Sequence, residues 1–178
     1  MDSINRNQPE RNRKDVAGAE AIARIKEVVK SQNVCFFVTK NGIGDSSGAR
    51  PMSVRNVDDQ GRLWFLSAND SHLNKELSQD PSSRLFFQGS GHSEFMELAG
   101  TVSISTDKSK IHDLWNPLIK VWFTEGIDDP RITVLTFEPQ DGYYWDNKHG
   151  DAIAGIKMLI GAAIGRTLDD SVEGVVRV

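Results

Sequence analysis

The chain has a single cysteine in 178 residues, so no disulfide can form within it. Cys35 lies in the apolar run 34–38, which predicts a buried, inert thiol rather than a nucleophile. No apolar run approaches the roughly 20 residues that span a bilayer, and the most apolar helix candidate, 152–164, contains Lys157. Residues 1–15 have no apolar signal-peptide core. We therefore expect a soluble protein, with the cytoplasm as its default location.

An excess of basic charge is also missing. The 21 Lys and Arg residues are outnumbered by 25 Asp and Glu residues, and the net charge of -4 argues against a nucleic-acid-binding protein. Hydrophobic residues make up 38% of the chain and charged residues 26%, as in a globular domain with a polar surface. The length fits one domain with a core of its own.

Several catalytic signatures are absent. The chain has no G-x-S-x-G elbow, no G-x-G-x-x-G fingerprint and no G-x-x-x-x-G-K loop, so neither a serine hydrolase nor a common nucleotide site is indicated. The histidines match no metal-ligand spacing, and we predict no metal site. They are His72, His92, His112 and His149.

Turn signals and hydrophobic periodicity predict short strands with helices at the edges. The predicted helices cover 16–31, 71–79, 107–123 with an interruption at Pro117, and 151–165; the predicted strands cover 34–39, 49–57, 62–67, 83–88, 94–105, 131–138 and 142–145. Gly100 lies inside a predicted strand, which predicts a β-bulge there. Helices and strands do not alternate regularly, which argues against a doubly wound parallel sheet.

The predicted fold is mainly β (α+β), a six-stranded antiparallel barrel with peripheral helices. Residues 1–15 form a predicted disordered arm, residues 16–165 the domain, and residues 166–178 a weakly ordered tail. The apolar strand 34–39 reads as a strand buried on both faces.

Aromatic residues concentrate in one stretch, 112–146. Three of the four tryptophans, Trp115, Trp122 and Trp145, lie there. Prolines and acidic residues interrupt the stretch, so it does not form a regular amphipathic helix. The pattern indicates either a binding surface or subunit interface, or a set of rings that fill a core.

Two polar segments could hold an anion. In 66–77 a strand leads through a small turn into a helix, and Ser67, Ser71 and Lys75 could bind phosphate at the helix N-terminus. Serine is also a common helix cap, which needs no ligand. In 49–55, Arg50 precedes Pro51 on a predicted edge strand and is either an anion ligand or a surface arginine.

Four segments in this order, ARPM (49–52), LWFLSANDSHLNKELSQDP (63–81), DLWNPLIKVWFTEGIDDPRITVLTFEP (113–139) and YYWD (143–146), resemble a known family. The chain is similar to the general stress protein 26 family of pyridoxamine 5'-phosphate oxidase-like, FMN-binding split-barrel proteins. The resemblance covers about residues 16–146. It implies a six-stranded split β-barrel, a homodimer, and FMN held in a cleft between the subunits.

The resemblance also implies which residues contact the flavin. Arg50, Pro51 and Met52 match a strand that lies along the flavin ring and reaches toward the phosphate. Leu66 and Ser67 match the next strand, which meets the polar edge of the ring, and Ser71 and His72 match the phosphate-binding turn. Related sequences place a lysine where this chain has Leu73, so Lys75 is the expected substitute, with Arg55 as an additional basic group. Trp145 and then Trp115 are the rings expected to approach the flavin from the subunit interface, whereas Trp122 is expected only to pack.

The expected function is that of a stress-related, FMN-dependent oxidoreductase of unknown substrate. No side chain stands out as a general acid or base, so no catalytic residue is assigned. The alternative is a non-enzymatic flavin carrier or sensor that uses the same dimer cleft. A more distant alternative is a split barrel that holds a deazaflavin, haem or nothing.

Overall fold

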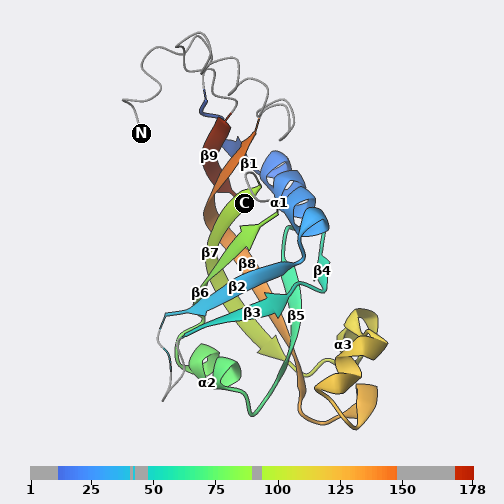
Figure 1. Cartoon of the computed structure of the whole chain (residues 1–178). Coiled ribbons are helices and arrows are strands. Elements are labelled where there is room, and N and C mark those ends of the chain that lie inside the picture. Colours follow the sequence, from blue (N-terminus) through green and yellow to red (C-terminus); the bar gives the residue numbers. More distant parts are fainter. Residues whose placement is uncertain (1–11, 41, 43–47, 90–93, 148–170) are drawn as a thin grey trace, which may run out of the picture.

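The computed structural model describes residues 12–40, 42, 48–89, 94–147 and 171–178. The helix predicted at 151–165 and most of the predicted N-terminal arm lie outside these residues. Strands dominate the described part of the chain and form one mixed sheet (Figure 1). The predicted mainly β fold class is confirmed.

Within the described residues the sheet contains nine strands, whereas a six-stranded barrel was predicted. They are β1 (Val16–Ala17), β2 (Val34–Thr39), β3 (Ala49–Ser53), β4 (Asn56–Val57), β5 (Leu63–Ala68), β6 (Ser82–Gln88), β7 (Phe95–Ser105), β8 (Ile132–Asn147) and β9 (Ser171–Arg177). Their order is β1-β9-β8-β7-β6-β2-β3, and β5 pairs with both β8 and β4. Every pair is antiparallel except β1 and β9.

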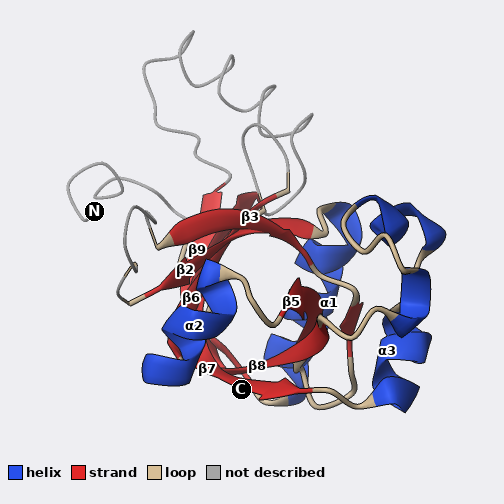
Figure 2. Cartoon of the chain, turned by 90° about the horizontal axis from the view of Figure 1, so that it is seen from below, coloured by secondary structure: helices blue, strands red, loops and turns tan. Residues whose placement is uncertain are grey.

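The path of hydrogen-bonded strands curves but does not close. Among the described residues, β3 pairs only with β2, and β5 lies across an opening from it. After β3 the chain moves to β5, where the Arg55 N–H donates to the Trp64 carbonyl oxygen at 2.7 Å. The two strands therefore meet at Arg55 and diverge from there. Viewed from below, the strands curve around a central region and α3 lies outside them (Figure 2).

Two sequence interpretations need correction at the C-terminal side of the sheet. Segments 131–138 and 142–145 are not separate strands but one long strand, β8. Residues 171–177 of the predicted weakly ordered tail form β9, which pairs with β8 on one side and β1 on the other. Buried Gly174 and Val176 alternate with more exposed residues along β9, and this short period-two pattern was missed.

Strand β2 is not buried on both faces. Cys35 and Phe37 point into the core, while Val34 and Phe36 are 40% and 60% exposed. The alternation is that of a half-buried strand, but the outward positions are occupied by apolar residues. Because residues on both faces of β2 are apolar, the sequence pattern does not show that one face is exposed.

The helices match the predicted positions within a few residues. They are α1 (Ala19–Ser31), α2 (His72–Gln79), α3 (Lys108–Leu114), and the 3-10 helices η1 (Pro117–Val121) and η2 (Gly126–Asp128). Ser71 caps α2 by accepting from the Asn74 N–H. The predicted break at Pro117 separates α3 from η1, and the Asn116 side chain caps η1. No described helix is both long and apolar enough to cross a membrane.

Two hydrophobic cores lie on opposite faces of β5. Leu63 and Phe65 point into the main core, together with buried residues of α1, α2 and the other strands. Trp64 and Leu66 point to the other side, where they pack against a second cluster formed by α3, η1 and the start of β8. Period-two alternation along β5 therefore connects the barrel to the α3–η1 segment.

The predicted bulge at Gly100 is confirmed, since the register of β7 and β8 shifts between Ala99 and Gly100. A Cβ at Gly100 would lie 2.1 Å from the Glu138 carbonyl oxygen, and this backbone atom cannot rotate away. We expect Gly100→Ala to lower the free energy of unfolding by at least about 2 kcal/mol. Urea denaturation checks this, with half-buried Ala99→Ser as a control expected to stay within about 0.5 kcal/mol. Equal stability of the two variants would contradict the bulge geometry.

Candidate functional site

A cleft of about 540 Å³ lies at the opening of the barrel, between β3, β5 and η1. This volume falls in the range of small-molecule sites, about 300–1,000 Å³. The lining residues are Pro51, Met52, Ser53, Arg55, Leu66, Ser67, Ala68, Ile119, Trp122 and Phe123. Five of the predicted site residues, Pro51, Met52, Arg55, Leu66 and Ser67, are thus brought together.

The walls of the cleft are mostly apolar, with polar groups at its two ends. Arg55 lies where β3 and β5 meet, and its Nε donates to the Leu114 carbonyl oxygen at 3.3 Å. Of the described residues that line the cleft, it alone is charged. Ser67 lies at the other end of β5, about 10 Å away along the strand. A flat apolar ligand with one anionic group matches this distribution.

Ser67 connects the cleft to the start of α2. Its hydroxyl lies 3.2 Å from the hydroxyl of Ser71, the residue that caps α2. Asn74 donates through its side-chain amide to the Thr133 hydroxyl at 2.9 Å, and Thr133 donates to the Ser67 carbonyl oxygen at 3.0 Å. This buried network fixes the α2 N-terminus beside the cleft, although Ser71 also has the capping role that needs no ligand.

Arg50 points to a different partner. Its Nη2 lies 2.7 Å from Oε2 of Glu76, a carboxylate with no exposed side-chain surface. The Thr39 hydroxyl donates to the same oxygen at 2.6 Å. Arg50 therefore links β3 to β2 and α2 and does not line the cleft. No local sequence pattern indicates this ion pair.

The remaining α2 residues divide between surface and core. His72 and Lys75 are exposed and do not line the cleft. Leu73 is 3% exposed and belongs to the main core. The position at which related sequences carry a lysine is thus a core position here, while Lys75 lies on the outer side of the helix.

The aromatic stretch does not form one surface. Trp115 packs against the second core, and Trp145 is an exposed residue of β8 that lies beside Tyr143, with ring centroids 4.7 Å apart. Neither lines the cleft within one chain. Trp122, which the sequence interpretation treated as packing alone, does line it and is 70% exposed.

Four further lining residues were missed, namely Ser53, Ala68, Ile119 and Phe123. Ile119 and Phe123 are four residues apart, and both are buried in the second core on either side of the exposed Trp122. That spacing on a turn-forming segment was the available signal. Ser53 and Ala68 have none, because their place depends on where β3 and β5 diverge.

The buried carboxylate of Asp129 positions Arg131, which contacts the backbone of Trp122. Asp129 accepts from Arg131 Nη2 at 2.7 Å and from Arg131 Nε at 3.0 Å, and Arg131 Nη2 also lies 3.5 Å from the Trp122 carbonyl oxygen. The hydrogen bonds from the Arg131 side chain hold the pKa of Asp129 down to about 2. The backbone turns directly after Asp129, since the Ile132 N–H donates to the Asp129 carbonyl oxygen at 3.2 Å.

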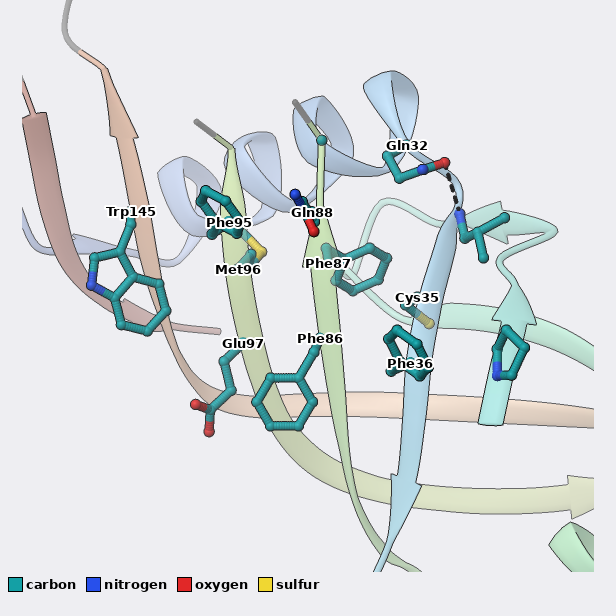
Figure 3. Close-up of a pocket in the computed structure, with 13 residues that line it drawn as sticks. Gln32, Cys35, Phe36, Phe86, Phe87, Gln88, Phe95, Met96, Glu97 and Trp145 are labelled. Atoms are coloured by element: carbon teal, nitrogen blue, oxygen red, sulfur yellow. Dashed lines mark hydrogen bonds between the residues drawn. The ribbon is translucent and has the colours of Figure 1, made fainter. Parts of the chain in front are cut away.

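A second hollow, of about 770 Å³, lies on the outer face of the sheet. Phe36, Phe86 and Trp145 project into it from β2, β6 and β8 (Figure 3). Phe36 lies opposite both Phe86 and Pro51 in the strand register, and Pro51 lines both this hollow and the cleft. The apolar outer face therefore continues to the mouth of the cleft.

Two predictions concern reactive and metal-binding groups. Cys35 is 2% exposed, and burial raises the pKa of its thiol to about 12, so the predicted buried and unreactive thiol is confirmed. In the described part of the chain, no group of three or more His, Cys, Asp or Glu side chains lies close enough together to hold a metal ion.

Comparison with protein families identifies the family to which the chain belongs. The family model described as "Pyridoxamine 5'-phosphate oxidase like" matches residues 20–169. The chain belongs to the pyridoxamine 5'-phosphate oxidase-like family. This membership and the open, curved sheet confirm the split-barrel prediction.

Members of this family that resemble the chain include General stress protein 26 of Bacillus subtilis, which is 25% identical over 44% of this chain and 58% of its own length. The chain covers less than two thirds of the curated relatives that it matches, 43% and 58% of their lengths. The resemblance to general stress protein 26 is confirmed.

Solved structures of the pyridoxamine 5'-phosphate oxidase-like type match more of the chain. A candidate general stress protein 26 from Jannaschia sp. CCS1 matches with a TM-score of 0.75 over 90% of this chain and 100% of its own, at 22% identity, which supports the fold. The general stress FMN/FAD binding protein of Xanthomonas citri is 28% identical, with a TM-score of 0.55 over 65% of this chain and 82% of its own.

Proposed function

We propose that this protein binds FMN non-covalently in the cleft between β3, β5 and η1 and acts as an FMN-dependent oxidoreductase. The observation that carries the proposal is the cleft itself, an apolar slot at the opening of a split barrel with polar groups at both ends. Family membership and the FMN/FAD-binding relative support it. FMN would supply the redox chemistry, and the chain would supply orientation and electrostatics.

The residues present fit such a group. Met52 and Leu66 offer flat apolar surface for the ring system, and Ser67 offers a hydroxyl. The phosphate would lie beyond Ser67, where α2 begins at the capping residue Ser71. A helix N-terminus attracts phosphate through its free N–H groups and dipole, and His72 and Lys75 would add basic side chains there. Arg55 would lie near the opposite end, beside the ring.

Titration of the apoprotein tests the proposal. We expect purified protein to carry a flavin spectrum and to release FMN on denaturation, and the apoprotein to bind both FMN and riboflavin. Colourless protein that ignores added FMN would exclude the flavin function.

Charge reversal on α2 tests the phosphate site. We expect Lys75→Glu to raise the Kd for FMN about tenfold and to leave the Kd for riboflavin unchanged, because riboflavin lacks the phosphate. Lys108→Glu, an equally exposed lysine at the start of α3, makes the same change in net charge as a control. If Arg55→Ala weakens the binding of FMN but not of riboflavin, and Lys75→Glu weakens the binding of neither, the phosphate lies at the Arg55 end of the cleft instead.

A flavin carrier or sensor is the second candidate, and one observation favours it. Among the described residues that line the cleft, Arg55 is the only charged side chain, and none is a histidine, carboxylate, lysine, cysteine or tyrosine of the kind that usually acts as a general acid or base. Bleaching of the flavin spectrum by NADH or NADPH at a useful rate would support the enzyme, and a reduced spectrum that no acceptor reoxidises would support the carrier.

We also propose that the protein is a homodimer with the flavin at the subunit interface. The exposed apolar face around Phe36, Phe86 and Trp145 is the surface that a second copy would cover. Because this face continues through Pro51 to the cleft, a partner seated on it would also approach the flavin. Trp145 would then take part in the interface, as the sequence resemblance implies.

A further inference from the structure

Trp122 combines two properties that rarely occur together in a side chain with only a packing role. It lines the cleft, yet 70% of it is exposed to solvent. An indole has a large apolar surface, and leaving it in water forgoes the favourable free energy of burial. An exposed apolar ring at the edge of a cavity therefore indicates a surface that a ligand or a partner covers.

The backbone that carries this ring is held in place from both sides. Ile119 and Phe123 are buried in the second core. The Trp122 N–H donates to the Ile119 carbonyl oxygen at 2.9 Å, and Arg131 donates to the Trp122 carbonyl oxygen. The segment is thus ordered without any contribution from burial of the indole, and ligand binding would not have to order it.

The position of Trp122 in the cleft favours a small molecule, rather than a protein partner, as the group that covers the indole. Leu118 and Val121 lie on the adjoining η1 helix and are 78% and 72% exposed, but neither lines the cleft. A protein partner would need to cover them, whereas a small molecule in the cleft reaches only Trp122. Among the described residues, the lining contains no carboxylate that would attract a cationic ligand.

We propose that Trp122 is the stacking surface of a substrate subsite at the mouth of the cleft, and that this subsite takes planar, uncharged ring compounds of the quinone class. The inference rests on the proposed function, because FMN would fill the inner part of the cleft between Met52 and Leu66. The ring compound would lie between the indole and the bound flavin. Flat apolar rings match both surfaces.

Equilibrium binding of 2-methyl-1,4-naphthoquinone to the FMN-loaded protein, measured by calorimetry, tests the subsite. Oxidised FMN does not react with a quinone, and the buried Cys35 thiol is protected from addition. We expect Trp122→Ala to raise the Kd for the quinone about tenfold and Trp122→Phe to raise it about threefold, because a smaller ring is retained. The Kd for FMN is measured separately for each variant, and the quinone affinities are compared only with every variant saturated with FMN.

A double variant on the same helix separates the ligand from a protein partner. Leu118→Ser with Val121→Ser should change neither the quinone Kd nor the oligomeric state. Loss of the dimer in this variant would mean that a second copy covers η1, and would overturn the subsite. Unchanged quinone affinity in Trp122→Ala, with FMN still bound, would also overturn it. Absence of FMN binding to the wild-type protein would instead refute the proposed function, from which the subsite follows.

Discussion

Replacing Glu76 by alanine is expected to lower the free energy of unfolding by about 3–5 kcal/mol, the usual effect of removing one partner of a buried ion pair. The Glu76 side chain has no exposed surface, and Arg50, its partner at 2.7 Å, is only 20% exposed. Truncation would leave the guanidinium of Arg50 without that carboxylate and the Thr39 hydroxyl without that acceptor. Urea denaturation followed by circular dichroism measures the loss.

Two further variants separate charge from volume at this site. Glu76→Gln keeps an oxygen for the Thr39 hydroxyl but removes the charge, and we expect it to lose less stability than Glu76→Ala. Glu27→Ala is the control, since Glu27 forms an ion pair with Arg24 but is 62% exposed, and we expect a change within about 0.5 kcal/mol. A Glu76→Ala protein as stable as the control would show that the ion pair does not hold α2 in place.

The Glu76 variants also concern Arg50, which has two candidate roles, contact with the flavin and the ion pair with Glu76. Sequence resemblance implied that Arg50 contacts the flavin, whereas the structure pairs it with Glu76 beneath α2. Because Glu76 lies on the helix whose N-terminus adjoins Ser67, loss of the ion pair would reach the cleft through a displaced α2. An Arg50 variant with weakened FMN binding is therefore informative only if its stability is measured as well.

The fold could largely be predicted from the sequence because local signals agreed with it. The gap between the predicted strands 49–57 and 62–67 marked the turn from β4 to β5, Pro117 separated α3 from η1, and Gly100 marked the bulge. Each of these signals acts through the local backbone, so no knowledge of distant contacts is needed. Strand β9 was not predicted because it is stabilised by pairing with β1 and β8. Strand β1 is remote from it in sequence, and β8 is separated from it by residues 148–170.

The site could be predicted only in part. Met52, Leu66 and Ser67 were found through their resemblance to a family motif, and they share the cleft because β3 and β5 diverge from Arg55. The tryptophans were grouped because they are close in sequence, but β8 carries Trp145 to the outer face of the sheet, away from Trp122. Closeness in sequence was therefore a poor guide to which tryptophan lines the cleft.

Placing a carboxylate on the outer face of the sheet is expected to break the proposed dimer. Phe36 is 60% exposed, and its direct neighbours across the strands are Phe86 and Pro51, which carry no charge. The Arg84 guanidinium lies over the Phe86 ring but already forms an ion pair with Glu97. Burying an unpaired aspartate at an interface costs several kcal/mol, so Phe36→Asp should weaken dimerisation about 100-fold or more. Sedimentation equilibrium over a range of concentrations measures this change. Folding should be preserved, because the side chain points away from the core.

A matched substitution distinguishes loss of an interface from a general effect of added charge. Ile104 is also an exposed apolar residue on a strand, at 36%, but it does not line the outer hollow, so Ile104→Asp should leave the oligomeric state unchanged. If the flavin lies between subunits, Phe36→Asp should weaken FMN binding together with dimerisation, while Ile104→Asp should change neither. A Phe36→Asp protein that is monomeric but binds FMN with wild-type affinity would place the whole flavin site within one chain. A Phe36→Asp protein that remains dimeric would mean that the subunits meet elsewhere, and the aromatic face would then need another partner.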